Sequence, residues 1–184
     1  MNKVLKKYTT IPENLYVVRN ADKQLEQIVE DMQRPGYVLV ARQMGKTNLL
    51  FHAKRTLESQ NRLFIYVDLS NPFSTDRECY RNIIDSIVEP YEDLFETIVP
   101  NIEAIRGKNL PAHKEYESSL RAVLKLFQGN MVIVLDEIDA LRSVNYSDNV
   151  FAQIRSNYFS RTNFPEFERL TYILSGVIEP TELM

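Results

Sequence analysis

The stretch that most constrains the fold is residues 37–47, with the sequence Tyr-Val-Leu-Val-Ala-Arg-Gln-Met-Gly-Lys-Thr. Its first four residues are apolar or aromatic and predict a short buried strand, whereas Thr47 to Ser59 has the apolar spacing of a helix. A strand, a tight loop and Gly-Lys-Thr at a helix start form the context of a phosphate-binding loop. The unpaired N–H groups and the positive dipole end of such a helix attract phosphate oxygens.

Individual residues of this loop suggest separate roles. Lys46 can reach the β- and γ-phosphates of a nucleotide, and the Thr47 hydroxyl can ligate Mg²⁺. The usual pattern begins with a glycine where Val40 stands here, so the loop must turn at Ala41 and Arg42 without glycine's freedom in φ. The alternative is a Gly-Lys-Thr sequence that only caps a helix.

A second apolar strand with acids at its end favours the phosphate-binding interpretation. Residues 131–135 are apolar and rich in β-branched types, and Asp136 and Glu137 follow directly. Carboxylates at the carboxyl edge of a parallel sheet lie where ligands bind in open α/β folds. Asp136 would hold Mg²⁺, usually through water, alongside Thr47, and Glu137 would polarise the attacking water. In the alternative, the acids are surface residues that cap the next helix, as Asp139 could do.

Composition narrows the class of protein. The chain has 184 residues, enough for one α/β domain with a sizeable core. Its net charge of −3 does not support nucleic-acid binding by bulk electrostatics and leaves room only for a local basic patch. Cys79 is the single cysteine, which excludes an internal disulfide. No apolar run approaches the ~18 residues of a membrane span, so we expect a cytoplasmic protein without a membrane partner.

The rest of the chain alternates predicted strands and helices. Residues 1–14 are expected to form an N-terminal arm and residues 15–184 the core. Helices are predicted at 22–32, at 76–98 with a break at Pro90, at 112–128 and at 145–160; further strands are predicted at 62–69 and 170–176, and a connection at 100–111. This alternation predicts a parallel sheet with right-handed crossovers. The spacing of the phosphate-loop strand and the acid-tipped strand predicts that an additional strand lies between them in the sheet.

Ser175 places a polar side chain at the end of the predicted fourth strand. It could sense the γ-phosphate of a nucleotide, or it could be an ordinary cap at the end of a strand. The residues alone leave these two interpretations equal.

Four segments occur in an order that resembles a known family. They are residues 16–22, 41–47, 134–139 and 167–177. Together they resemble the bacterial AAA-like domains of the STAND class of signalling ATPases, over about residues 16–183. The loop Arg-Gln-Met-Gly-Lys-Thr is the most specific piece, and that family commonly lacks the first glycine of the loop.

The resemblance implies a fold, cofactors and roles for residues. The fold would be a three-layer α/β P-loop NTPase of the ASCE or AAA type, with a parallel sheet flanked by helices. ATP and Mg²⁺ would be bound, with Lys46 and Glu137 catalytic and with Thr47 and Asp136 as metal ligands. The nucleotide would be contacted by Arg42, Gln43, Met44, Gly45, Lys46, Thr47 and Asn48, with Arg19 and Asp22 near the adenine and Ser175 at the sensor position.

The family domain continues with a further helix, a fifth strand and a helical lid. We therefore expect that this chain is truncated at its C-terminus and lacks an arginine finger. Such domains usually lie beside effector or repeat modules in longer proteins, and ATP drives a switch in assembly. The resemblance thus predicts a Mg-ATP-binding regulatory switch in signalling or defence, with slow or conditional hydrolysis and with self-association or such modules as partners.

Two other functions stay open. A DNA-associated ATPase related to origin-recognition or transposition helpers would share this core and would need a basic surface. Arg155, Arg161 and Arg169 could contribute to that surface, although Glu166 and Glu168 interrupt it. The third function is a non-hydrolysing protein-interaction module whose nucleotide pocket has decayed. The presence of the loop lysine, the loop threonine and both acids argues against this function. No Asn-Lys-x-Asp guanine-reading motif occurs, and only the resemblance favours adenine.

Overall fold

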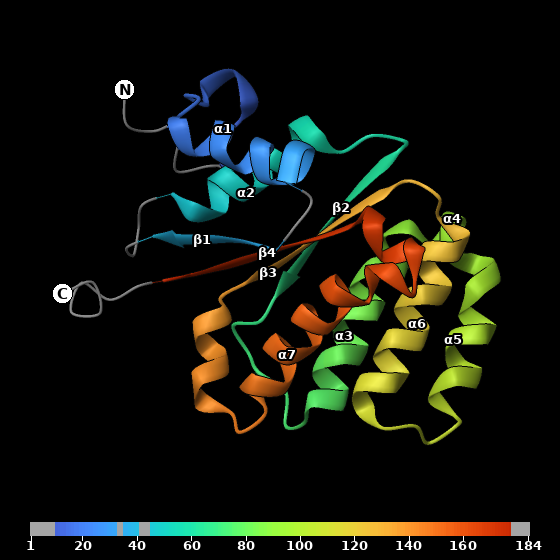
Figure 1. The fold of residues 1–184 in the computed structure, drawn as a ribbon. Helices are drawn as coiled ribbons and strands as arrows, with labels where there is room; N and C mark the ends of the chain where they lie inside the picture. Colours follow the sequence, from blue (N-terminus) through green and yellow to red (C-terminus); the bar gives the residue numbers. More distant parts are fainter. Residues whose placement is uncertain (1–9, 33–34, 41–44, 178–184) are drawn as a thin grey trace.

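The structure, a computed structural model, describes residues 10–32, 35–40 and 45–177. Its strands form one parallel sheet in the order β1-β4-β3-β2 (Figure 1). They are β1 (Gly36–Val40), β2 (Arg62–Asp68), β3 (Asn130–Asp136) and β4 (Leu170–Val177). Because β4 lies between β1 and β3, the predicted strand between the phosphate-loop strand and the acid-tipped strand is confirmed.

Helices cover the two faces of this sheet (Figure 1). They are α1 (Asn20–Gln27) with a π-helical continuation (Ile28–Met32), α2 (Lys46–Leu57), α3 (Asp76–Val88), α4 (Glu92–Phe95), α5 (Val99–Arg106), α6 (Ala112–Leu126) and α7 (Ser147–Phe159). Figure 1 shows α1 and α2 on one face and α3, α6 and α7 on the other, so the predicted three-layer α/β architecture is confirmed. In the part of the chain that the structure describes, no helix has both the length and the apolar character to cross a bilayer.

The alternation of side chains along the strands divides the core in two. Phe64, Val134 and Ile173 pack with the apolar residues of α1 and α2. Their strand neighbours Ile65 and Leu135 pack with the helices of the opposite face. Strands β3 and β4 are buried on both faces, which explains why they are nearly continuous apolar runs in the sequence.

Strand β1 is less buried than its sequence predicts. Tyr37 and Leu39 are 60% and 44% exposed, respectively. Within the described residues β1 pairs only with β4, so it lies at an edge of the sheet. The expectation of a buried strand is wrong on this face, because no helix among the described residues covers these two side chains.

The segment at residues 76–98 breaks where a proline was expected to interrupt it. Helix α3 ends at Val88, and a 3₁₀ turn (Glu89–Tyr91) contains Pro90. Proline lacks the N–H needed to continue an α-helix and clashes with the preceding turn.

The predicted connection at residues 100–111 is wrong over most of its length, because α5 occupies residues Val99–Arg106. Pro100 lies in the first turn of this helix, where its missing N–H costs nothing. Ile102 and Ile105 are buried, so tertiary packing stabilises a helix in a segment that Pro100 and Pro111 had led us to predict as a connection.

Candidate functional site

The phosphate-loop segment has the local geometry that its sequence predicts. Gly45 lies in the left-handed region, with φ 77° and ψ 25°, which glycine adopts without strain. Lys46 begins α2, so the helix starts at Gly-Lys-Thr as expected. Thr47 is exposed and Asn48 is half-buried in the first turn. Arg42, Gln43 and Met44, also expected to contact nucleotide, lie outside the described residues.

The loop lysine and the two acids come together at the carboxyl end of β3. The ammonium of Lys46 lies 2.7 Å from Asp136 Oδ1 and 2.7 Å from Glu137 Oε1. Lys46 and Asp136 are buried, whereas Glu137 is 36% exposed. Because Asp136 is only 1% exposed, it is not the surface cap of the alternative interpretation.

Tyr66 is a member of this cluster that the sequence did not predict. Its hydroxyl donates a hydrogen bond of 2.6 Å to Asp136 Oδ2. The backbone N–H of Glu137 donates to Asp136 Oδ1 at 2.9 Å. Tyr66 lies two residues before Asp68, the register partner of Asp136, so period-two alternation would find it only once the pairing of β2 with β3 is known.

Burial and hydrogen bonds have opposite effects on the pKa values of the two oppositely charged residues, Asp136 and Lys46. Burial alone would raise the pKa of Asp136, but hydrogen bonds from Lys46 and Tyr66 outweigh it and lower that pKa. Burial alone would lower the pKa of Lys46, and its hydrogen bonds to Asp136 and Glu137 reverse the effect and raise it. Burial and the bond to Asp136 raise the pKa of the Tyr66 hydroxyl, so Tyr66 stays a donor.

Glu137 has a backbone conformation that is uncommon for its residue type. Its φ of 58° and ψ of 39° lie in the left-handed region, which costs an L-residue other than glycine roughly 1–2 kcal/mol. A 3₁₀ helix, η6 (Ile138–Ser143), follows directly. Strained backbone of this kind clusters at functional sites. Asp139, two residues on, accepts a hydrogen bond from the Val177 N–H at 3.0 Å and so ties η6 to the end of β4.

Ser175 lies on β4 and is fully buried. Its hydroxyl is close enough to the Asp136 carboxylate to contribute to lowering that residue's pKa. It makes no hydrogen bond of normal geometry with any residue that the structure describes. A buried hydroxyl without such a partner, beside the acids, is a donor that a ligand could use.

Arg19 and Asp22 lie beside the loop, on the segment that leads into α1. Arg19 Nη2 donates to the Tyr16 hydroxyl at 2.9 Å and approaches the carbonyl oxygen of Gly45 at 3.5 Å. Asp22 accepts hydrogen bonds of 2.7 Å from the Tyr16 hydroxyl and from the Arg19 backbone N–H. The Tyr16 ring stacks on His52 of α2, with centroids 3.9 Å apart. Arg19 therefore lies at the phosphate loop itself, while Asp22 anchors the segment.

Ile11, which lies within the segment expected to form an N-terminal arm, contacts the same helix. The N–H of Ile11 donates to Asn48 Oδ1 at 2.7 Å, and Arg55 donates to the Ile11 carbonyl at 3.2 Å. Asp22 and His52 line a hollow of about 210 Å³ between α1 and α2. The segment before α1 thus forms a wall close to the first turn of α2.

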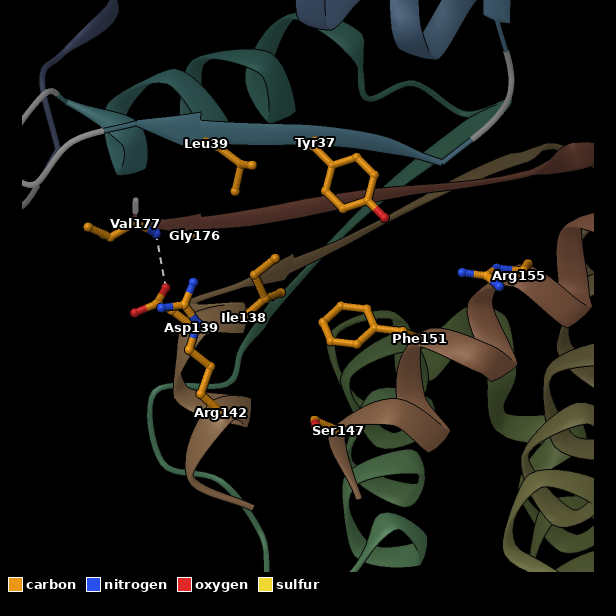
Figure 2. Close-up of a pocket in the computed structure, with 10 residues that line it drawn as sticks. All are labelled: Tyr37, Leu39, Ile138, Asp139, Arg142, Ser147, Phe151, Arg155, Gly176 and Val177. Carbon is orange, nitrogen blue, oxygen red and sulfur yellow. Dashed lines mark hydrogen bonds between the residues drawn. The ribbon is translucent and has the colours of Figure 1, made fainter. Parts of the chain in front are cut away.

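A larger cavity of about 710 Å³ lies on the other face of the sheet (Figure 2). Figure 2 shows that its lining includes Tyr37 and Leu39 of β1, Ile138 and Asp139 of η6, and Phe151 and Arg155 of α7. Neither the loop lysine nor the two acids line it. The cavity therefore neighbours the charged cluster without containing it.

Comparisons with known proteins agree with this geometry. A family model described as an AAA domain matches residues 29–183. An uncharacterized WD repeat-containing protein of Synechocystis is 26% identical over 152 residues, which cover 80% of this chain and 13% of that protein. Two solved structures share the fold at a TM-score of 0.62 and cover 92% of this chain. They are the Aeropyrum pernix ORC2 protein in ADPNP–ADP complexes, at 17% identity, and a Walker-type ATPase of Pyrococcus abyssi, at 16%. The chain spans 43% and 47% of those two chains.

Proposed function

Because the chain belongs to the AAA domain family, we propose that it binds ATP together with Mg²⁺ at the cluster formed by Gly45, Lys46, Thr47, Asp136 and Glu137. The observation that carries this proposal is the 2.7 Å approach of Lys46 to both acids at the start of α2. A lysine at a helix N-terminus, beside two carboxylates at the carboxyl edge of a parallel sheet, suits a triphosphate and its metal.

The donor set of the cluster fits Mg²⁺. This ion is usually held by one or two carboxylates, with phosphates and waters as the other ligands. Asp136 supplies a carboxylate and Thr47 a hydroxyl, while no group of three or more His, Cys, Asp or Glu side chains among the described residues could form a metal cage. When bound, Mg²⁺ would neutralise phosphate charge.

The side chains of the cluster divide the remaining work. When nucleotide binds, Lys46 would donate its hydrogen bonds to phosphate oxygens and no longer to the two acids. Glu137, partly exposed, would orient the attacking water and accept its proton. The buried Ser175 hydroxyl would donate to the γ-phosphate, and Arg19, with the segment before α1, would bound the nucleotide near the loop.

We further propose that the domain acts as a slow regulatory switch of the STAND type within a longer protein. The Synechocystis relative supports this, because its name records WD repeats and the matched segment is 13% of its length. Positioning and electrostatics carry most of phosphoryl transfer, and both acids are engaged with Lys46 in the structure, so we expect slow turnover. Turnover near or above ~1 s⁻¹ by the isolated chain would contradict a slow switch.

Calorimetric titration tests the binding proposal. ATP and, separately, GTP are titrated with Mg²⁺ into the wild-type chain, Lys46→Ala and Lys54→Ala. Lys54 lies on the same helix in a loose 3.9 Å ion pair with Glu58, so its removal is the matched control. We expect micromolar ATP binding that is lost in Lys46→Ala and kept in Lys54→Ala. Wild-type protein that binds no nucleotide, or equal losses in both variants, would contradict the proposal.

A DNA-associated ATPase is the second candidate, favoured by the fold shared with the ORC2 protein. The predicted basic surface, however, is weaker than the sequence suggests. Arg169 donates to the carbonyls of Phe127, Gly129 and Leu124, and Arg161 donates to that of Leu170. These guanidinium groups hold the fold together. DNA affinity that falls steeply with salt would favour this candidate over the switch.

A further inference from the structure

We propose that Tyr66 is a positioning residue that fixes the orientation of the Asp136 carboxylate, so that Oδ1 faces the phosphate loop. This inference rests on the proposed Mg²⁺ and ATP site. It adds a residue from β2, a strand that carries neither the loop nor the acids. Tyr66 would act through Asp136 and would not touch the nucleotide.

The two oxygens of Asp136 have separate partners. Oδ2 accepts the Tyr66 hydroxyl at 2.6 Å, while the Ser175 hydroxyl lies near the carboxylate without a hydrogen bond of normal geometry. Oδ1 receives the Lys46 ammonium at 2.7 Å and the Glu137 backbone N–H at 2.9 Å. A carboxylate can rotate so that its oxygens exchange places, and a donor dedicated to one of them opposes that rotation. Tyr66 therefore selects which oxygen points to the loop.

Strand pairing fixes the backbone position of Tyr66, and one aromatic contact holds its ring. Parallel pairing of β2 with β3 sets Tyr66 opposite Val134, two residues before Asp136. The ring of Phe51, on α2, packs against the Tyr66 ring with centroids 4.9 Å apart. Phe51 lies one helical turn beyond Thr47, the other proposed metal ligand. The tyrosine thus connects the carboxylate to the helix that carries the lysine and the threonine.

This arrangement matters most once a triphosphate has drawn Lys46 away from the acids. Oδ1 then loses its cation and is free for Mg²⁺ or a water bound to it, while Oδ2 stays bonded to Tyr66. Without the tyrosine hydroxyl, Oδ2 would be buried without its donor and would compete with Oδ1 for Lys46 or for the metal. Groups that orient a metal ligand typically contribute a factor of about 10 to 100 in metal affinity.

The experiment compares wild-type protein with Tyr66→Phe and with a matched control, Tyr80→Phe. Tyr80 likewise donates its hydroxyl to a single acceptor, the Asn149 carbonyl at 2.9 Å, but it is buried on the opposite face of the sheet. ATP affinity is measured in EDTA, Mg²⁺ is then titrated into each ATP complex, and thermal midpoints are recorded. We expect Tyr66→Phe to keep its metal-free ATP affinity and to bind Mg²⁺ about 10-fold more weakly or worse. Tyr80→Phe should match wild type in both titrations.

A double variant separates positioning from a general structural role. In an Asp136→Asn background, Tyr66→Phe should cause no further loss of Mg²⁺ affinity, because the carboxylate it positions is gone. Equal losses in both backgrounds, or an unchanged Mg²⁺ titration of folded Tyr66→Phe, would overturn the inference while leaving the proposed function intact. Wild-type protein that binds no ATP would overturn both.

Discussion

Lys46 forms ion pairs with two carboxylates at a site that water reaches poorly. Asp136 is almost fully buried, and its only cation within ion-pair distance among the described residues is Lys46. Removing one partner of a buried ion pair leaves a desolvated charge, which is more damaging than losing an exposed pair. The residue proposed to bind phosphate is therefore also a structural residue.

Lys46→Ala should lower the free energy of unfolding by about 3 kcal/mol at neutral pH, because Asp136 is left buried without its cation. The folded-state pKa of Asp136 is lowered, so its contribution is present above the unfolded value of about 3.9 and is lost as pH falls through the folded pKa. Urea denaturation at neutral pH measures the loss. The loss should shrink in an Asp136→Asn background, and an equal loss in both backgrounds would show that the pair is not its cause.

The backbone of Glu137 gives a second prediction at this scale. Glu137→Gly should be more stable than Glu137→Ala by about 1 kcal/mol, because the left-handed conformation strains alanine but not glycine. At exposed Glu26 in helix α1 the order should reverse, since glycine is the poorer helix former. Denaturation curves of the four variants decide this, and an alanine variant as stable as the glycine variant at 137 would contradict it.

Residue types alone indicated which charged groups would meet, but not how they are held. Lys46, Asp136 and Glu137 were predicted because each lies in a motif with its own strand or helix context. Tyr66 was missed because its role depends on the register between two strands, which short sequence patterns do not specify. Arg19 was expected near the adenine through the family resemblance, and its contact with the Gly45 carbonyl places it at the loop.

At the scale of elements, Glu115 joins α3 to α6. Its side chain is 4% exposed, and both Arg77 and Arg81 of α3 pair with it; Arg81 Nε lies 2.6 Å from Oε1. Arg77 also donates to the Leu110 carbonyl just before α6. Burial alone would raise the pKa of Glu115, but hydrogen bonds and attraction from the two arginines lower it.

Glu115→Gln should reduce the free energy of unfolding by about 2 kcal/mol at pH 7. Because the folded pKa of Glu115 is lowered, its contribution is fully present above the unfolded value of about 4.3 and is lost as pH falls through the folded pKa. The two proteins should therefore converge in acid. Glu103→Gln, at a 62% exposed carboxylate paired with Arg106, is the control and should change little. A gap between wild type and Glu115→Gln that is constant with pH would contradict this.

Element types were predictable wherever apolar periodicity was strong. All four strands were predicted close to their observed bounds, and α6 and α7 were found from their apolar faces. Helix α5 was missed because prolines were taken to mark a connection, although proline in a first helical turn is compatible with a helix. The exposure of Tyr37 was missed because apolar content does not reveal whether a strand lies at an edge.

At the scale of the whole molecule, the site lies where the start of α2 meets the carboxyl end of β3. Ligand bound there should stabilise the folded chain as a unit. At a concentration about 100 times its dissociation constant, Mg·ATP adds about 2.7 kcal/mol, which for a chain of this size raises the thermal midpoint by roughly 5–10 °C. Thermal unfolding with and without ligand measures the shift. An equal shift in Lys46→Ala would mean that the stabilising site is elsewhere.

Glu137 has a further consequence for the protein's tolerance of change. Its left-handed backbone suits glycine, whereas the proposed chemistry requires a carboxylate. A mutant library screened only for heat resistance should therefore enrich glycine among the replacements at this codon, and a library screened for turnover should retain glutamate. The residues recovered at position 137 would show whether the screen had selected for stability or for turnover.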